Sequence, residues 1–198
     1  MIVNGIEYLD EDVEFFPDGS IHDATLARDT MVQDLPCAED RSVVFYPSGR
    51  LQLAWLASPA EIQGVPCAAD TVLYLHENGR VLNTSLGGDC SFGGLALPAG
   101  SRVSLNEDGS LLEYSQRLES DGIVEGLPCS AAFHVWRYPG GQPSLVVLAA
   151  PHVIGGQEYP RGAEIAMAED GEVLDAHVLD LDSGWRYQQR VFGVYEAD

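Results

Sequence analysis

The sequence predicts an all-β protein, a repeat solenoid or β-roll of about six 30-residue hairpin units. Three observations lead to this fold class. A turn glycine recurs at a nearly constant spacing, apolar residues alternate with polar ones on both sides of it, and Gly and Pro interrupt the chain too often for a long helix. A closed barrel or small sandwich, built from the same hairpins, is the alternative architecture.

The turn glycine defines the repeat. Successive copies lie 30, 30, 30, 32 and 30 residues apart, and four of the six follow Asp or Asn. Because Asp-Gly and Asn-Gly accept positive φ angles, each copy predicts a tight hairpin turn. The turn glycines are Gly19, Gly49, Gly79, Gly109, Gly141 and Gly171.

A strand is expected on each side of every turn. In the second unit, "VVFYPSGRLQLAWL", Val43 and Phe45 precede the glycine by six and four residues, and Leu51 follows it by two. This period of two is typical of a strand with one buried face. The same positions in the other units are mostly apolar, so we expect the hairpins to stack and bury these faces against one another.

A return segment completes each unit, with forms such as "VQDLPC", "IQGVPC" and "VEGLPC". Cys37, Cys67 and Cys129 directly follow its proline, and Ala99 and Arg161 take that position in two other units. Zinc sites usually show paired spacing such as C-x-x-C, and no such pair accompanies these cysteines. We therefore expect small buried side chains rather than a metal or redox column.

The whole chain, residues 1–198, is expected to form a single β-repeat domain, and its length suffices for a real core. Residues 1–12 are expected to form an N-terminal partial repeat, because "VNGIEY" matches "IGGQEY" near the other end. Residues 180–198, "DLDSGWRYQQRVFGVYEAD", break the pattern and are expected to form a C-terminal cap.

The hairpin core "FYPSGRL" resembles the variant MORN-type repeats of bacteria, whose units are similar to Tyr-Tyr-Pro-Asn-Gly-Lys-Leu. The resemblance covers about seven residues of each unit, and the period here is longer than in that family. It implies an extended β-sheet that serves as a scaffold or an interaction surface.

The chain is strongly acidic, with 31 Asp and Glu against ten basic residues, all of them Arg, for a net charge of −21. Nucleic acids and anionic membranes need a basic surface, so neither is an expected partner. The acidity indicates a salt-adapted surface or one that meets a basic protein. No signal peptide or run of eighteen apolar residues is found, so we expect a cytoplasmic protein with free thiols.

The fifth unit departs most from the pattern. Arg137 replaces an apolar residue, the turn becomes Pro-Gly-Gly, and Pro143 takes the first apolar position of the second strand. Departures from a local rule often mark functional sites, and Trp, Tyr and Arg dominate binding hot spots. We therefore expect a binding site at His134, Trp136, Arg137 and Tyr138. A local bulge that puts Trp136 inside and Arg137 outside would also explain the pattern.

The chain contains no nucleophile elbow, phosphate loop, zinc-protease motif or dinucleotide fingerprint. We therefore expect no catalytic residues, no metal, no cofactor and no enzymatic activity. The expected function is a protein-interaction scaffold that acts through its extended sheet surface. An acidic inhibitor, such as an immunity protein or nucleic-acid mimic that binds a basic protein, is the alternative. A small-ligand binder or enzyme with a site near the fifth unit is the second alternative, and the sequence leaves the oligomeric state open.

Overall fold

The computed structural model describes residues 1–179, without the side chains of residues 10–12. Strands account for every regular element in this range, and no helix occurs in it, so the predicted all-β class is confirmed. None of the described elements is therefore a helix that could cross a membrane. The predicted cap, residues 180–198, lies outside the described residues.

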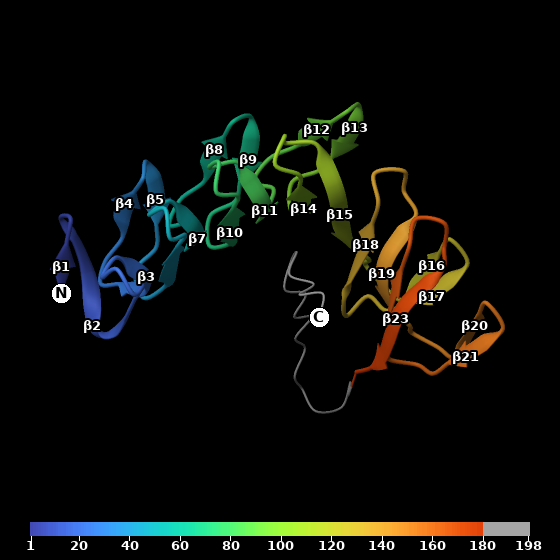
Figure 1. The fold of residues 1–198 in the computed structure, drawn as a ribbon. Coiled ribbons are helices and arrows are strands. Elements are labelled where there is room, and N and C mark those ends of the chain that lie inside the picture. Colours follow the sequence, from blue (N-terminus) through green and yellow to red (C-terminus); the bar gives the residue numbers. More distant parts are fainter. Residues whose placement is uncertain (180–198) are drawn as a thin grey trace. The chain divides into compact units, whose positions relative to one another are not determined.

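The chain divides into two compact units, residues 1–112 and residues 113–198. In each unit, the long hairpins of the repeat join into an antiparallel main sheet, and each return segment forms a small hairpin of its own (Figure 1). The main-sheet strands of the first unit, in order of pairing, are β1 (Ile2–Val3), β2 (Ile6–Phe15), β3 (Ile21–Leu26), β6 (Ser42–Phe45), β7 (Leu51–Trp55), β10 (Val72–Leu75), β11 (Val81–Ser85) and β14 (Arg102–Leu105).

The second unit repeats this arrangement. Its main-sheet strands, in order of pairing, are β15 (Leu111–Arg117), β18 (His134–Arg137), β19 (Pro143–Val147), β22 (Ala163–Met167) and β23 (Val173–Val178). The return hairpins of the two units are β4 (Thr30–Val32) with β5 (Leu35–Cys37), β8 (Ala60–Ile62) with β9 (Val65–Cys67), β12 (Cys90–Phe92) with β13 (Leu95–Leu97), β16 (Gly122–Val124) with β17 (Leu127–Cys129), and β20 (His152–Ile154) with β21 (Gln157–Tyr159).

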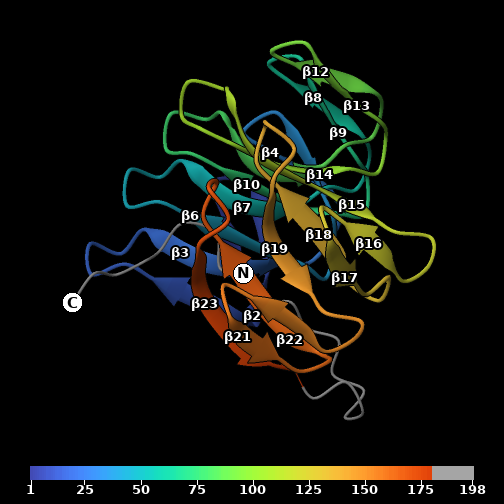
Figure 2. The same ribbon diagram turned by 90° about the vertical axis from the view of Figure 1, so that its right-hand side faces the viewer.

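The pairing order follows the chain and leaves the sheet open, as the predicted repeat solenoid requires, rather than closed into the alternative barrel. Each return segment is a complete two-stranded hairpin of its own. In the first unit these hairpins lie on the same side of the main sheet (Figure 1). Figure 2 looks along their row, and β8–β9 and β12–β13 overlap in that view.

The six repeat glycines adopt positive φ as predicted, but in a three-residue loop. In the first turn, the Gly19 amide donates to the Phe16 carbonyl and the Phe16 amide donates to the Ser20 carbonyl. The register shifts by one residue before the turn, as in a type I turn followed by a glycine bulge. Asp18 itself keeps a negative φ, and its carboxylate instead accepts the Ser20 amide at 2.9 Å. Asp and Asn therefore stabilise these turns because their side chains accept a main-chain hydrogen bond.

The two-residue turn with positive φ at both positions occurs in the return hairpins. The N-terminal hairpin β1–β2 has the same turn, in which Asn4 and Gly5 have φ values of 53° and 80°, the type I′ geometry. Most of these turns place Gly at the second position. The return hairpin β4–β5 has Asp34 there, at a φ of 66°, where an L-residue is strained.

The core lies between the main sheet and the return hairpins. We call the side of the main sheet that meets the hairpins the inner face, and the opposite side the outer face. In the first unit, one cross-strand row of the inner face is at most 1% exposed along six neighbouring strands. This row consists of Ala24, Val43, Ala54, Leu73, Thr84 and Val103. In the second unit, Val135, Val146 and Ile165 pack against the hairpin residues Val124, Leu127 and Cys129.

A ladder of side-chain hydrogen bonds links successive repeats. In the second, third and fifth repeats, the residue three positions before the turn glycine points its polar end at a main-chain carbonyl 29 residues further along the chain. The Tyr46 hydroxyl donates to the Leu75 carbonyl at 2.8 Å, and the His76 ring nitrogen Nε2 lies 2.8 Å from the Leu105 carbonyl. This ladder ties each of these three hairpins to the next at its turn end.

Candidate functional site

The four residues predicted to bind occupy β18 and the start of its turn, but they do not form one patch. Because side chains alternate along a strand, His134 and Trp136 lie on the outer face while Val135 joins the core. The Arg137 guanidinium donates to the Gly141 carbonyl of its own turn at 2.9 Å. The Tyr138 hydroxyl donates to the Met167 carbonyl at 2.9 Å, which makes Tyr138 a member of the repeat ladder.

The expected bulge is present between Trp136 and Arg137, but it is common to the hairpins and not special to the fifth unit. Trp136 is buried, at 3% exposure. Arg137 is half-buried, and its charge lowers the pKa of Cys129, which burial otherwise raises. The sequence signal at Arg137 and Tyr138 therefore has a structural explanation, and a binding role for the four residues stays a prediction.

The outer face around Trp136 is mainly apolar and buried. Trp136 pairs with Leu145 on β19 and with Ser115 on β15. A hydrogen bond of 3.2 Å joins the Ser115 hydroxyl and the His134 Nδ1. This pair has the residue types of a nucleophile and its base, but Ser115 is 0% exposed. A hydroxyl buried to this extent is not presented to a substrate.

In the first unit, the outer face of β6, β7 and β10 is half-exposed and carries a contiguous group of large side chains. Val44, Leu53 and Tyr74 follow one another in one cross-strand row, and Trp55 and Val72 lie side by side in the next. We call these five residues, on β6, β7 and β10, the outer-face cluster. The guanidinium of Arg41 lies over the Trp55 ring, 4.6 Å from its centroid, a cation–π contact at the border of the cluster.

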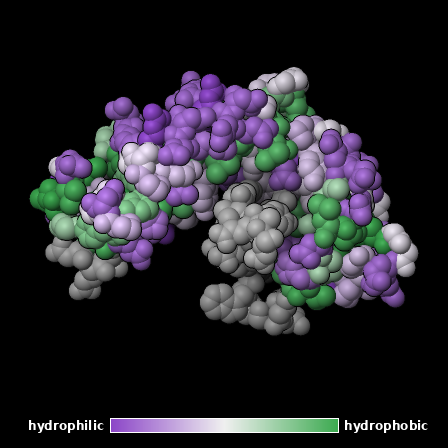
Figure 3. Space-filling model, in the orientation of Figure 1, coloured by the Kyte–Doolittle hydropathy of each residue, from purple (hydrophilic) through white to green (hydrophobic). Residues whose placement is uncertain are grey.

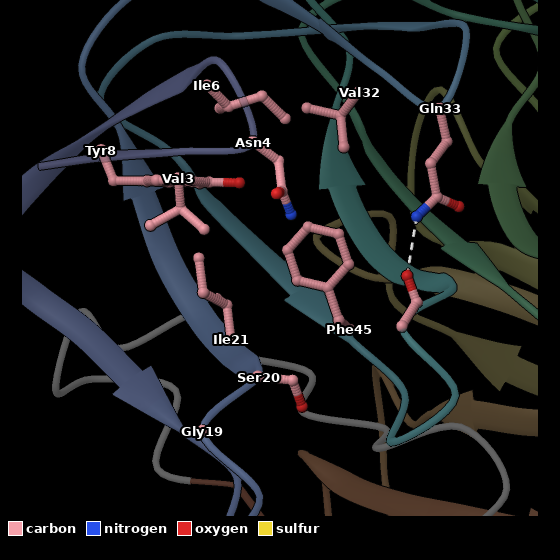
Figure 4. Close-up of a pocket in the computed structure, with 11 residues that line it drawn as sticks. Val3, Asn4, Ile6, Tyr8, Gly19, Ser20, Ile21, Val32, Gln33 and Phe45 are labelled. Carbon is pink, nitrogen blue, oxygen red and sulfur yellow. Dashed lines mark hydrogen bonds between the residues drawn. The ribbon is translucent and has the colours of Figure 1, made fainter.

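A cavity of about 420 Å³ lies at the N-terminal end of the first unit (Figure 4). We call it the N-terminal pocket. Its walls come from the tips of the hairpins β1–β2 and β4–β5 and from the first two turns. Figure 4 shows the Asn4 side chain pointing into the space between the apolar walls, while the Gln33 side chain donates to the Gly49 carbonyl at 2.8 Å. The apolar lining residues are Val3, Ile6, Tyr8, Ile21, Val32 and Phe45, and the others are Asn4, Gly19, Ser20, Gln33 and Gly49.

The surface around this pocket differs from that of the neighbouring return hairpins. In Figure 3 the outward side of β4–β5 and β8–β9 is mainly hydrophilic, whereas hydrophobic side chains gather at the N-terminal end. Ile2 is 69% exposed and Met31 is 59% exposed. Ile2 and Met31 are the chain neighbours of the lining residues Val3 and Val32, and alternation along each strand directs their side chains away from those residues. The sequence showed no sign of this pocket, because it forms between segments about 30 residues apart.

Three of the four cysteines are part of the core, Cys90 is partly exposed, and all four thiols are free. Cys37, Cys67 and Cys129 are each 0% exposed, and burial raises the pKa of each thiol to about 11. The prediction that Ala99 and Arg161 take the position of these cysteines in two other repeats was wrong. Leu97 pairs with Cys90, and Tyr159 pairs with His152. By this strand register, Leu97 and Tyr159 are equivalent to the buried cysteines of the other return hairpins, and Ala99 and Arg161 are not. The proline is an unreliable guide because in these units it follows the strand.

Among the described side chains, those of residues 1–9 and 13–179, no group of three or more His, Cys, Asp or Glu is arranged to hold a metal ion. The two histidine–carboxylate pairs found there lie far apart in the chain. His22 is 3.6 Å from the Glu14 carboxylate, and His177 is 3.2 Å from that of Glu164. These pairs connect neighbouring strands of a hairpin, as cross-strand partners do.

Several acidic residues hold the backbone rather than forming one charged patch. The Asp29, Asp89 and Asp121 carboxylates each accept an amide ten residues further along and so close a return segment. Hydrogen bonds from the hydroxyls of Ser20 and Ser110 lower the pKa of Asp18 and Asp108, respectively. The Asp18 and Asp108 carboxyl groups therefore stay ionised at neutral pH, at turns that border the main sheet.

The comparisons with known proteins do not identify a family. No family model matches the chain, and no curated protein matches it. Among solved structures, the chain is similar to one described as "Crystal structure of GtfA/B complex bound to UDP and GlcNAc", with 10% identity and a TM-score of 0.21. The match covers 86% of this chain and 32% of that one, so this chain spans about a third of the other's length. At that TM-score the similarity carries no functional argument.

Proposed function

We propose that this chain is a non-enzymatic β-repeat scaffold that binds a basic protein through the outer face of its first unit. The outer-face cluster is the observation that carries the proposal. A cluster of Val44, Leu53, Trp55, Val72 and Tyr74 on three neighbouring strands is larger than the scattered apolar residues of an ordinary surface. Trp, Tyr and Arg are the residue types that dominate protein-binding hot spots, and Arg41 already stacks on Trp55.

The geometry of this face suits a protein better than a small molecule. The outer rows run across six strands, from β3 to β14, which at about 4.8 Å per strand gives a width of roughly 24 Å. A standard protein interface buries about 800 Å² on each partner. The cluster provides an apolar centre for such an interface, and half-exposed polar residues such as Ser42 and Ser85 border it.

The charge of the unit favours a basic partner. Residues 1–112 contain 17 acidic residues against five arginines, a net charge of −12. From β3 to β14, Asp23 is the single acidic residue in the two outer rows, and Glu14 on β2 pairs with it. The rows otherwise continue through the five cluster residues, Thr25, Ser42, Asn83, Ser85, Arg102 and Ser104. Acidic residues that border an apolar centre steer a basic protein to it and reject acidic ones.

The acidic-inhibitor alternative is supported by the same net charge. An inhibitor that imitates nucleic acid would bind mainly through carboxylates. At least six aspartates instead accept main-chain hydrogen bonds at turns and return segments, which favours the scaffold: Asp18, Asp29, Asp89, Asp108, Asp121 and Asp170. The four free cysteines support a place in a reducing compartment such as the cytoplasm. The hairpins that resemble MORN-type repeats also favour a scaffold.

Affinity capture from the source cell tests the proposal when it compares three versions of the chain. Wild type, the variant Leu53→Ser with Trp55→Ala, and the control Ile123→Ala are used side by side. Ile123 is 71% exposed and belongs to a return hairpin of the second unit, so it is an apolar residue away from the outer face. We expect a basic protein that binds wild type and the control directly, and that binds the double variant at least about tenfold more weakly.

Two results would contradict the proposal: undiminished binding of the double variant, and binding that depends on the carboxylates alone. Loss of folding is controlled for separately. Partners that bind the double variant as tightly as wild type would show that the outer face is not the interface. Binding that is lost in the double variant because the chain no longer folds would be recognised by its circular dichroism spectrum. In that case the milder change Trp55→Phe decides between the two explanations. Partners that bind only when the carboxylates are intact, whatever stands at residue 55, would favour the acidic inhibitor.

A further inference from the structure

The residue after the turn glycine connects neighbouring turns in the middle of the first unit. This residue is arginine in repeats two and three. The Arg80 guanidinium donates to the Asp108 carbonyl of the next turn at 3.1 Å. It passes so close to Gly109 that a Cβ on that glycine would lie 2.9 Å from its NH1. Arg50 approaches Gly79 in the same way, with a distance of 3.7 Å to the corresponding Cβ position.

The first repeat has the same turn without this arginine. Its residue is Ser20, whose hydroxyl donates to Asp18 in its own turn at 2.6 Å. Asn78, one residue before its turn glycine, donates to the Glu107 carbonyl of the next turn at 3.0 Å, but the carboxylate at Asp18 has no proton to donate. In the fourth turn, the carbonyls of Asp108 and Glu107 accept from Arg80 and Asn78. The carbonyls of Ser48 and Pro47 occupy the equivalent positions in the second turn.

The N-terminal pocket lies where the first repeat differs. Both Ser20 and Gly49 line it, and these two residues correspond to the pairs Arg50 with Gly79 and Arg80 with Gly109. Its apolar walls, such as Ile21 and Phe45, match the methylene chain of an arginine, which packs on apolar surface. The Asn4 amide oxygen is available as an acceptor inside the pocket (Figure 4).

We propose that the N-terminal pocket binds the side chain of an arginine supplied by a basic protein partner. The occupant repeats what Arg50 and Arg80 do one and two turns further along. Charge supports this choice, because residues 1–30 contain eight acidic residues against Arg28. The Asp18 carboxylate, next to the lining residue Gly19, stays ionised because Ser20 donates to it. Arginine is preferred to lysine because its planar guanidinium offers five donors to carbonyl and amide oxygens.

This site goes beyond the proposed function, because it uses a surface other than the outer face. Its test uses short peptides and needs no knowledge of the partner. Acetyl-Gly-Arg-Gly-amide is titrated into the full chain, and chemical shifts are followed by amide NMR. We expect saturable shifts at Asn4, Ser20 and Gly49, at least about tenfold weaker binding of the lysine peptide, and no binding of the citrulline peptide, which has the same shape without the charge.

Two variants sharpen the test. Ser20→Arg supplies the missing side chain from the chain itself, so we expect it to fill the pocket and weaken binding of the arginine peptide at least about tenfold. Ser110→Arg is the matched control. Ser110 donates to Asp108 as Ser20 does to Asp18, and it does not line the pocket, so binding should be unchanged. Arg50→Ser should create a second site, seen as new shifts at Gly79.

Three results would overturn the inference. Equal binding of the arginine, lysine and citrulline peptides would show that the pocket does not recognise a guanidinium. Undiminished binding to Ser20→Arg would place the site elsewhere. Absence of shifts at Asn4 and Gly49 while other residues shift would do the same. Each of these results leaves the outer-face test unaffected, because that test depends on Leu53 and Trp55.

Discussion

The two faces of the main sheet in residues 1–112 differ in how much their side chains vary from strand to strand. On the inner face, the row from Ala24 to Val103 is at most 1% exposed on all six strands, and each member is small or aliphatic. On the outer face, the adjoining row runs through Asp23, Val44, Leu53, Tyr74, Asn83 and Ser104, and its chemistry changes from strand to strand. The inner face is uniform because close packing tolerates little variation, whereas the outer face can be adapted to a partner.

The largest expected difference between the protected core and the outside is in thiol reactivity. Cys67 is 0% exposed with a pKa of about 11, so it should react with iodoacetamide only through unfolded molecules. Since the unfolded fraction of a stable domain is about 10⁻³ or less, labelling should be at least about 1,000-fold slower than in denaturant. Cys90 is partly exposed and should react much faster. Mass spectrometry of labelled peptides at pH 7 measures both rates.

The control for this experiment is labelling in denaturant, where both thiols should react alike. If Cys67 reacted as fast as Cys90 in the native state, the core described for the return hairpins would be wrong.

Matched leucines on the two faces should differ in stability. Leu73 is 0% exposed on the inner face, and Leu53 is half-buried on the outer face of the neighbouring strand. Leu73→Ala should lower the free energy of unfolding by about 2–5 kcal/mol, because it leaves a cavity in the core. Leu53→Ala should cost about 1 kcal/mol, because it removes only partial burial. Urea denaturation of both variants checks this, and equal losses would contradict the assignment of the faces.

The ladder should contribute less than the core. Tyr46→Phe removes the hydroxyl that donates to the Leu75 carbonyl, and Tyr138→Phe does the same toward Met167. Each change should lower the free energy of unfolding by about 1 kcal/mol, the net value of one hydrogen bond. Tyr159→Phe is the control, because no hydrogen bond from its hydroxyl is found within residues 1–179. Thermal and urea denaturation measure the three variants, and a loss no larger than that of the control would argue against the ladder.

The smallest expected effect is a gain, in the return hairpin. Asp34 has a φ of 66° in a turn where Gly64 holds the same position of the next hairpin at 84°. Asp34→Gly should raise the free energy of unfolding by a few tenths to about 1 kcal/mol, because relief of strain exceeds the entropy that glycine adds to the unfolded chain. Gly64→Asp is the matched reverse change and should lower it. Differential scanning calorimetry resolves such shifts, and a loss in Asp34→Gly would show that the aspartate side chain stabilises its turn.

Local patterns in the sequence predicted the hairpins well. The turn glycines, the alternating strands and the order of the repeats depend on backbone sterics within about ten residues, so they can be recognised in any one repeat. The return hairpins were harder to predict. Their type I′ turns, such as Gln33-Asp34, lack the usual Asn-Gly signal, and the proline suggested a wrong equivalence for Ala99 and Arg161.

The candidate sites depended more on tertiary structure. The fifth unit stood out in the sequence, but alternation and the bulge separate His134 and Trp136 from Arg137, and Tyr138 bonds to a carbonyl 29 residues away. The outer-face cluster could have been found by aligning the repeats and comparing the strand residues that alternate with the core residues. The N-terminal pocket could not, because a serine in place of an arginine is an ordinary surface change until the neighbouring turn is known.

The sequence by itself determined that this chain is a stack of β-hairpins with one apolar face. The repeat period, the turn residues and the apolar–polar alternation are local features that recur in every repeat. Tertiary structure decided which side chains meet across repeats: the ladder from Tyr46, the cluster around Trp55 and the cavity beside Ser20. The ladder and the cavity join residues about 30 positions apart, and the cluster joins neighbouring hairpins. Strand register, which no single repeat encodes, sets which of these residues become neighbours.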